Sequence, residues 1–131
     1  MSTPFKAAVE ARDFDAAIDC LAPDVTFHSP VAHRPFEGKE LVGQVLLAVS
    51  QTFEDFEYTD EFETGDTHAL IFRARVGDKR LQGLDLLRLN DDGLIEELTV
   101  MVRPASGLMA LGQAMGRRWR PSKPARRPGS Q

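Results

Sequence analysis

The sequence predicts an α+β domain in which helices from the first half of the chain cover one face of a curved β-sheet formed by the second half. Apolar residues recur at helical spacing up to about residue 53 and alternate from residue 54 onward. With 131 residues, 42% of them hydrophobic and 27% charged, the chain matches one ordinary globular domain. No basic segment leads into a long apolar run, so we expect no signal peptide, no membrane span and a cytoplasmic location.

Two short helices are expected at the start of the chain. Thr3 resembles an N-cap before a helix over 4–12, whose first position is a proline. Asp13 can cap a second helix over 13–21, and Pro23 would end it because the residue before a proline avoids helical geometry.

A strand and a longer helix follow. The β-branched and aromatic segment VTFHSPV, 25–31, predicts a short strand closed by Pro30. The segment 38–53 then has apolar residues four positions apart, which predicts a helix that packs one side inward. That side comprises Leu41, Val45, Val49 and either Thr52 or Phe53.

The second half of the chain predicts a four-stranded antiparallel meander. The turn signals TGD, VGD and NDDG separate strands at 54–63, 67–76, 80–89 and 94–103. Such short connections join antiparallel neighbours. A short terminal helix is expected within 105–119, with an apolar side formed by Leu108, Leu111 and Met115.

Alternation along the strands predicts which face is buried. In 67–76 the interior face comprises Leu70, Phe72, Ala74 and Val76. In 81–89 one face comprises Leu81, Gly83, Asp85, Leu87 and Leu89, and the other comprises Gln82, Leu84, Leu86 and Arg88. A strand that is apolar on both faces needs cover on both. We therefore expect helices on the inner face and a homodimer that forms through the outer sheet face.

Charge divides the chain into a domain over 1–116 and a tail over 117–131. The domain carries 10 basic and 20 acidic residues, a net charge of −10, whereas the tail is basic and rich in proline. Such a tail buries too little surface to offset its ordering entropy, so we expect it to be flexible. Nucleic-acid binding is not expected unless the tail alone supplies it.

No metal or cofactor is predicted. The single cysteine, Cys20, and three scattered histidines have no metal-ligand spacing, and no internal disulfide can form. No phosphate-binding loop, dinucleotide fingerprint or serine nucleophile elbow occurs.

Three segments, in order, carry a family resemblance: LAPDVTFHSP, FEGKE and LDLLRLNDDGLIEELTV. Over roughly residues 4–115 the chain resembles the nuclear transport factor 2-like superfamily, and in particular its SnoaL-like and ketosteroid-isomerase-like bacterial members. The resemblance implies a cone in which a strongly curved sheet and helices enclose an apolar pocket, and a dimer that packs through the outer sheet face. It does not decide function, because the superfamily includes isomerases, dehydratases, cyclases and non-catalytic binders.

Asp85 is the main candidate site residue. Its strand places it among leucines, where a carboxylate needs a partner or a raised pKa. In ketosteroid isomerases the corresponding aspartate stays protonated and donates a hydrogen bond to the steroid oxyanion. That family's general-base position aligns with Ser29, and its first-helix tyrosine falls near Phe5. A serine cannot take a proton from carbon without its own base, so we do not expect the family's steroid isomerase activity.

The sequence does not decide whether a histidine takes part in catalysis. If His28 or His33 reached Asp85, the pair would be an acid/base device similar to the His and Asp pairs of SnoaL-like cyclases. The expected ligand-binding residues are Phe5, Phe27, Ser29, Phe53, Phe72, Leu98, Val100 and Val102.

Two hypotheses follow. The first is a cofactor-independent enzyme of isomerase, cyclase or dehydratase type that acts on an apolar cyclic molecule. The second is a non-catalytic binder of a hydrophobic ligand, or a dimerisation module. A histidine nitrogen or a second carboxylate beside Asp85 would favour the first.

Overall fold

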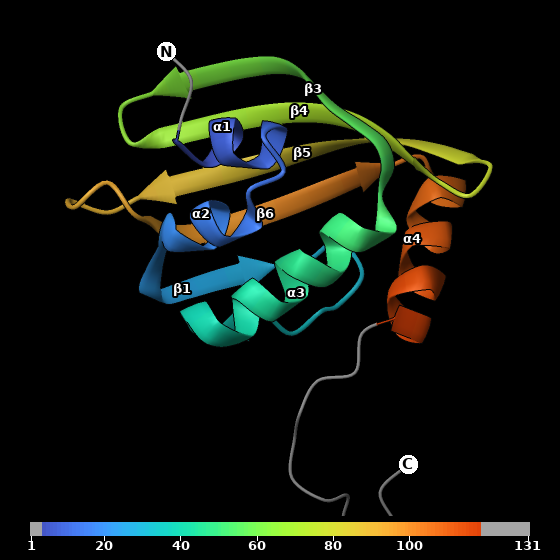
Figure 1. Ribbon diagram of the computed structural model, residues 1–131, viewed down its shortest axis with the longest axis horizontal. Coiled ribbons are helices and arrows are strands. Elements are labelled where there is room, and N and C mark those ends of the chain that lie inside the picture. Colours follow the sequence, from blue (N-terminus) through green and yellow to red (C-terminus); the bar gives the residue numbers. More distant parts are fainter. Residues whose placement is uncertain (1–3, 119–131) are drawn as a thin grey trace, which may run out of the picture.

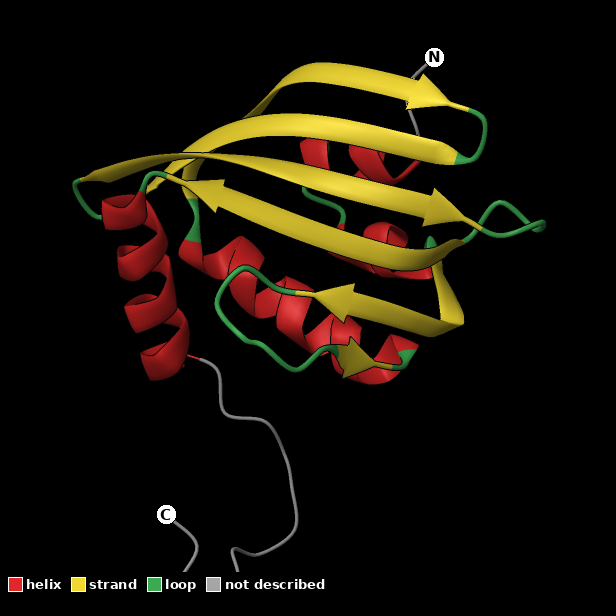
Figure 2. Cartoon of the chain, turned by 180° about the vertical axis from the view of Figure 1, so that it is seen from behind, coloured by secondary structure: helices red, strands yellow, loops and turns green. Residues whose placement is uncertain are grey.

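The computed structural model describes residues 4–118, in which one open, curved sheet carries helices on one face and leaves its other face uncovered (Figures 1 and 2). Its strands are β1 (Leu21–His28), β2 (Phe36–Glu37), β3 (Glu54–Thr64), β4 (Thr67–Val76), β5 (Lys79–Leu89) and β6 (Ile95–Arg103). Its helices are α1 (Pro4–Glu10), α2 (Phe14–Asp19), α3 (Lys39–Thr52) and α4 (Ala105–Arg118). The predicted α+β class is confirmed.

The sheet has the order β2-β1-β6-β5-β4-β3. The meander β3 to β6 was predicted correctly, and each strand boundary differs from its predicted position by at most one residue. Gly65 and Gly77 adopt the left-handed conformations that these tight turns require, with φ of 58° and 62°. One pair departs from the antiparallel arrangement: β1 runs parallel to β6, with His28 opposite Thr99.

The first helix ends earlier than predicted, at Glu10 instead of Arg12. Arg12 is left-handed, with φ of 59°, and its N–H donates to Val9 O at 3.0 Å. The Asp13 N–H then donates to Ala8 O at 2.9 Å, which closes the helix end. Asp13 is the N-cap of α2, as predicted, because its Oδ1 accepts the Ala16 N–H at 3.1 Å. Thr3, the expected N-cap of the first helix, lies outside the described residues.

The second helix and the first strand meet at a different place from the one predicted. The helix ends at Asp19, and β1 already starts at Leu21, so that Pro23 lies within the strand. The ladder between β1 and β6 is irregular between Leu21 and Thr26. A proline, which has no N–H to donate, is tolerated at such an interruption. The strand ends at His28, before the Ser-Pro pair that was expected to belong to it.

α3 packs on the sheet by a side slightly rotated from the predicted one. Its buried residues are Val42, Gly43, Val45, Ala48 and Thr52, while Leu41 and Val49 are only half-buried. α4 stands at one end of the sheet (Figure 1), with Leu111 buried and Leu108 and Met115 half-buried. A Cβ on Gly107 would lie 2.8 Å from the backbone of Arg80, so this glycine lets α4 approach β5 closely.

The core lies between the helices and the inner sheet face. The predicted interior residues Leu70, Phe72 and Ala74 of β4 are buried, and Val76 is half-buried. None of the described helices is long and apolar enough to cross a membrane. Of the predicted basic tail, Arg117 and Arg118 belong to α4, and residues 119–131 lie outside the described part of the chain.

Candidate functional site

A cavity of about 420 Å³ lies between the helices and the inner face of the sheet. All four described helices contribute to its wall, as do the strands and the loop that follows β1. Most of the lining side chains are aliphatic or aromatic. The polar exceptions are Arg12, Ser29, Ser50, Tyr58 and Asp85.

Asp85 provides the one carboxyl group among the described lining residues. Alternation along β5 turns it inward with Leu81 and Leu87, and its cross-strand partners are Leu70 and Val100. The residue is only 8% exposed. Loss of hydration raises the pKa of its carboxyl from 3.8 to about 7, and a hydrogen bond from Tyr58 acts in the opposite direction. At neutral pH the group is therefore close to the midpoint between acid and carboxylate.

Tyr58, on β3, is the hydrogen-bond partner of that carboxyl. Its hydroxyl donates to Asp85 Oδ2 at 3.0 Å. Burial of the phenol, followed by the charge of Asp85 and the hydrogen bond between them, raises the pKa of Tyr58 well above its ordinary range. The hydroxyl therefore stays protonated and acts as a donor. Phe56 and Phe72 hold the ring by edge-to-face contacts, with centroid distances of 4.9 and 6.4 Å.

An aromatic wall closes the end of the cavity near α4. Phe72 stacks on Phe56 at a centroid distance of 4.9 Å and contacts Phe53 at 5.5 Å. The Phe72 ring lies across Gly83 of the neighbouring strand, where an added Cβ would come within 2.6 Å of Cε2. A side chain at this position would displace the ring, so Gly83 fixes the shape of this wall.

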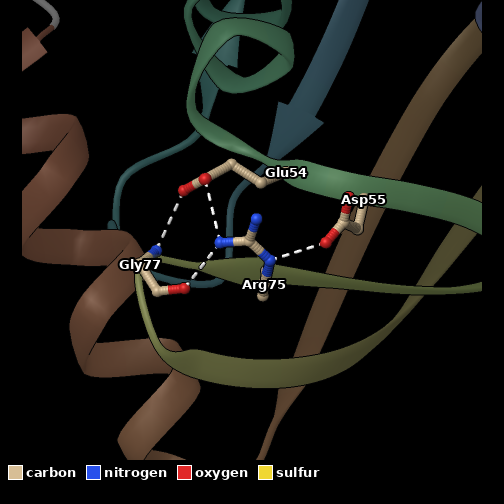
Figure 3. Close-up of polar contacts among 4 residues, drawn as sticks. All are labelled: Glu54, Asp55, Arg75 and Gly77. Atoms are coloured by element: carbon tan, nitrogen blue, oxygen red, sulfur yellow. Dashed lines mark hydrogen bonds and ion pairs between the residues drawn. The ribbon is translucent and has the colours of Figure 1, made fainter.

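A polar cluster, Glu54, Asp55, Arg75 and Gly77, fixes the start of β3 next to this wall (Figure 3). Arg75 donates to Asp55 at 2.6 Å and to Glu54 at 2.9 Å, and Glu54 also accepts the Gly77 N–H at 3.0 Å. Asp55 adopts a left-handed backbone with φ of 53°. These contacts join the start of β3, between Phe53 and Phe56, to the end of β4 and the β4–β5 turn.

Seven of the eight expected ligand-binding residues line the cavity. They are Phe5, Phe27, Ser29, Phe53, Phe72, Leu98 and Val100. Val102 does not line it but packs against the cluster around Phe72 and Leu111, because it lies further along β6 toward α4.

The two histidines considered as bases do not meet Asp85. His28 points to the outer sheet face, where its Nε2 lies 3.0 Å from Glu97 Oε2 and its side chain is 40% exposed. Strand alternation explains this placement, since the preceding Phe27 points inward. His33 is exposed in the loop between β1 and β2. Neither imidazole is among the residues that line the cavity, and the third histidine, His68, does not line it either.

Ser29 lines the cavity, but its hydroxyl oxygen is engaged in a turn. Oγ accepts the N–H groups of Val31 and Ala32 at 3.1 and 3.0 Å. These bonds shape the chain after β1. Among residues 4–118 no base has a hydrogen bond to Ser29, and so its hydroxyl is not activated as a proton acceptor there.

Sequence reasoning missed Tyr58 and Arg12. Tyr58 belongs to the acidic segment FEDFEYTDEFE, which resembles a solvated edge strand. The spacing of Phe56 and Tyr58, two residues apart, was the available signal that both point to one face. Arg12 was placed inside a helix, and only its left-handed backbone brings it to the cavity. No group of three or more described His, Cys, Asp or Glu side chains could hold a metal ion.

Comparisons with known proteins identify relatives of this chain. A family model described as a SnoaL-like domain matches residues 4–98. A steroid delta-isomerase from Pseudomonas aeruginosa is 44% identical, with a TM-score of 0.82 over 86% of this chain and 83% of that one. A protein with a cystatin-like fold from Silicibacter pomeroyi is 34% identical, with a TM-score of 0.83 over 88% and 82%. No curated protein matches this sequence.

More distant structures share the fold. A putative ketosteroid isomerase from Kribbella flavida is 22% identical, with a TM-score of 0.64 over 78% of this chain and 74% of that one. A de novo designed protein with a curved β-sheet is 17% identical, with a TM-score of 0.68 over 89% and 99%. The similarity to a designed protein shows that the architecture alone carries no particular chemistry.

Proposed function

The chain belongs to the SnoaL-like domain family, and on that premise we propose that it binds an apolar, cyclic small molecule in its cavity and holds one ligand oxygen at Asp85. The Asp85–Tyr58 pair in an otherwise apolar cavity is the observation that carries the proposal. A volume of about 420 Å³ falls in the range of small-molecule sites. Apolar sites with a small number of polar groups bind ligands of this kind and orient them by those groups.

The pair supports a specific mode of recognition. Tyr58 donates to Oδ2, so the proton of the neutral carboxyl resides on Oδ1. From there it can be donated to a carbonyl or ether oxygen in the cavity. Above the pKa of about 7 the carboxyl loses this proton and repels such an oxygen. Ligands that only accept hydrogen bonds should therefore bind better below neutral pH.

Binding is favoured over two-group acid/base catalysis because the described residues that line the cavity offer no second group to accept a proton. Asp85 is the single carboxyl among the described lining residues, and no histidine lines the cavity. Tyr58, whose pKa is raised by burial and by Asp85, keeps its proton at neutral pH. An enzyme that moves a proton from one carbon to another needs a base that is ionised in the cavity.

The binding proposal is tested with a naphthyl ketone whose fluorescence reports the polarity around it. Affinity of the wild type should fall about tenfold from pH 5 to pH 8, because about one carboxyl in ten stays protonated one unit above its pKa. Asp85→Asn should remove this pH dependence, and Asp85→Leu should weaken binding at pH 5, where the wild-type carboxyl is protonated. Asp91→Asn, an exposed aspartate of the β5–β6 turn, is the matched control. Affinity that depends on neither pH nor Asp85 would contradict the proposal.

A second candidate function, steroid isomerisation, is favoured by the 44% identity to a protein of that name. Ser29 opposes it, since the resemblance to ketosteroid isomerases places the general base at this position. The assay is conversion of a β,γ-unsaturated 3-oxosteroid to its conjugated isomer, followed by ultraviolet absorbance. We expect no turnover by the wild type and a gain in Ser29→Asp, which places a carboxylate in the cavity wall. Turnover by the wild type that Asp85→Asn abolishes would favour the isomerase instead.

We also propose a homodimer formed through the outer sheet face. No described helix covers this face (Figure 2), and Phe62 and Met101 are 60% and 52% exposed on it. Met101 lies opposite Leu84, which lies opposite Ile71, so an apolar row crosses three strands. Sedimentation at micromolar concentration should give a dimer, and Leu84→Arg should give a monomer. Met109→Arg, at a 63% exposed position on α4, should stay dimeric. A monomeric wild type would contradict the proposal.

A further inference from the structure

Arg12 is the single cation among the described residues that line the cavity. It follows α1 and precedes the N-cap of α2. Because Arg12 is exposed and also lines the cavity, it lies at the rim, whereas Asp85 is buried in the wall. Its guanidinium lies 5.7 Å from the ring centre of Phe14, another lining residue. The cavity thus has a neutral or acidic group inside and a positive charge at its opening.

The backbone at Arg12 is unfavourable for an arginine. The residue is left-handed, with φ of 59°, at the helix-terminating position where glycine is the usual choice. Glycine would adopt this conformation without steric conflict, and arginine adopts it at a cost in free energy. Strain of this kind is tolerated where the side chain has a use.

The Arg12 side chain does not serve to form an ion pair within the described part of the chain. The ion pairs of the described residues involve other cations, and Arg12 forms none of them. Its ring contact with Phe14 holds the guanidinium beside the opening while its donors stay available. A guanidinium in this state is suited to a carboxylate or a similar oxyanion.

We infer that the ligand of this cavity is an amphipathic acid: an apolar cyclic body inside the cavity, with an anionic oxygen group that pairs with Arg12 at the rim. The inference rests on the proposed function, and it narrows the ligand class from apolar cyclic molecules in general to those that carry a negative charge at the end away from Asp85. The charge at the rim remains hydrated, which avoids the penalty of burying it.

The test compares two probes that differ in charge and by one methyl group: a naphthyl ketone with a carboxylate on a short alkyl chain, and the methyl ester of the same compound. Fluorescence titration at low salt and pH 6 gives both dissociation constants. The wild type should bind the acid about fivefold more tightly than the ester, in the range of a solvent-exposed ion pair, and added salt should reduce this ratio.

Four variants define the role of the side chain. Arg12→Gln and Arg12→Gly should lose the preference for the acid and keep the affinity for the ester, and Arg12→Gly should also remove the backbone strain. Arg12→Lys should retain most of the preference. Arg34→Gln, at an exposed arginine that does not line the cavity, should behave as the wild type. If one Arg12 variant fails to fold, the other uncharged variant gives the same comparison.

The outcomes separate the two proposals. Equal binding of acid and ester by the wild type, with the ester still sensitive to Asp85→Leu, would overturn the role of Arg12 and leave the proposed function intact. A preference for the acid that persists in Arg12→Gln and Arg12→Gly would overturn it as well. Failure of both probes to bind would overturn the proposed function and this inference with it.

Discussion

Replacement of Asp85 by asparagine should stabilise the protein at neutral pH. The folded pKa of Asp85, about 7, lies above its ordinary value of 3.8. The carboxyl therefore favours the folded state fully below pH 3.8, and this stability is lost as pH rises through 7. At about 1.4 kcal/mol for each pH unit between the two values, the loss reaches roughly 4 kcal/mol above pH 8. Asparagine has nearly the same shape, keeps an oxygen to accept the Tyr58 hydrogen bond and never ionises.

The measurement is urea unfolding of the wild type and Asp85→Asn at pH 5 and pH 8. The difference in unfolding free energy between the two proteins should grow by about 2.5 kcal/mol between these pH values, in favour of the variant. Other titrating groups are common to both proteins and cancel in the difference. Asp91→Asn, at an exposed position, should show no such change. If the difference between wild type and Asp85→Asn stays constant across this range, Asp85 is not a buried acid with a raised pKa, and the site described above loses its central group.

Three further changes test the same geometry. Tyr58→Phe removes the hydrogen bond that lowers the pKa of Asp85, so the pKa of this carboxyl should rise further. A carbon-detected NMR titration of the carboxyl would report the change. An unchanged pKa would show that the hydrogen bond is not formed in solution. Gly83→Ala forces the Phe72 ring aside and should lower stability by about 1–3 kcal/mol in thermal unfolding, whereas an unaffected melting temperature would mean that the ring moves freely. Asp13→Ala removes the N-cap of α2 and should destabilise by about 1 kcal/mol in urea unfolding, while Asp13→Asn should preserve most of the stability.

The meander was predictable because its signals are local. Turn residues at three places divide the second half of the chain, and alternation on each side then decides which face is buried. The same logic turned Asp85 inward, as the structure has it. The two-residue strand β2 was not predictable, since it exists only by pairing with β1. Pro23 was misinterpreted because an interruption of the ladder, which no local pattern reveals, allows a proline within the strand.

Strand alternation predicted which way Asp85 points, but it could not predict the hydrogen-bond partner of that residue. The sequence indicates that Asp85 needs a partner, but it cannot say that Tyr58, on a strand two places away in the sheet, is that partner. Their meeting depends on the curvature of the sheet, which brings side chains of non-adjacent strands together on its inner face. The position of Arg12 at the cavity could not be predicted either, because α1 ends two residues earlier than its apolar pattern suggests.

The parallel pairing of β1 with β6 also bears on how the chain folds. Leu21 pairs with Ile95 and His28 with Thr99, so the two strands come from opposite ends of the domain. The hairpins of the meander close over short loops, whereas this ladder joins residues separated by well over half of the domain, and closure entropy grows with loop length. The β3–β6 hairpins can therefore form first, and β1 with its helices docks late. On the ribosome, β1 cannot pair with β6 until β6 has emerged. Until then the inner face of the sheet, Asp85 included, stays open to water, and the cavity is among the last parts of the protein to exist.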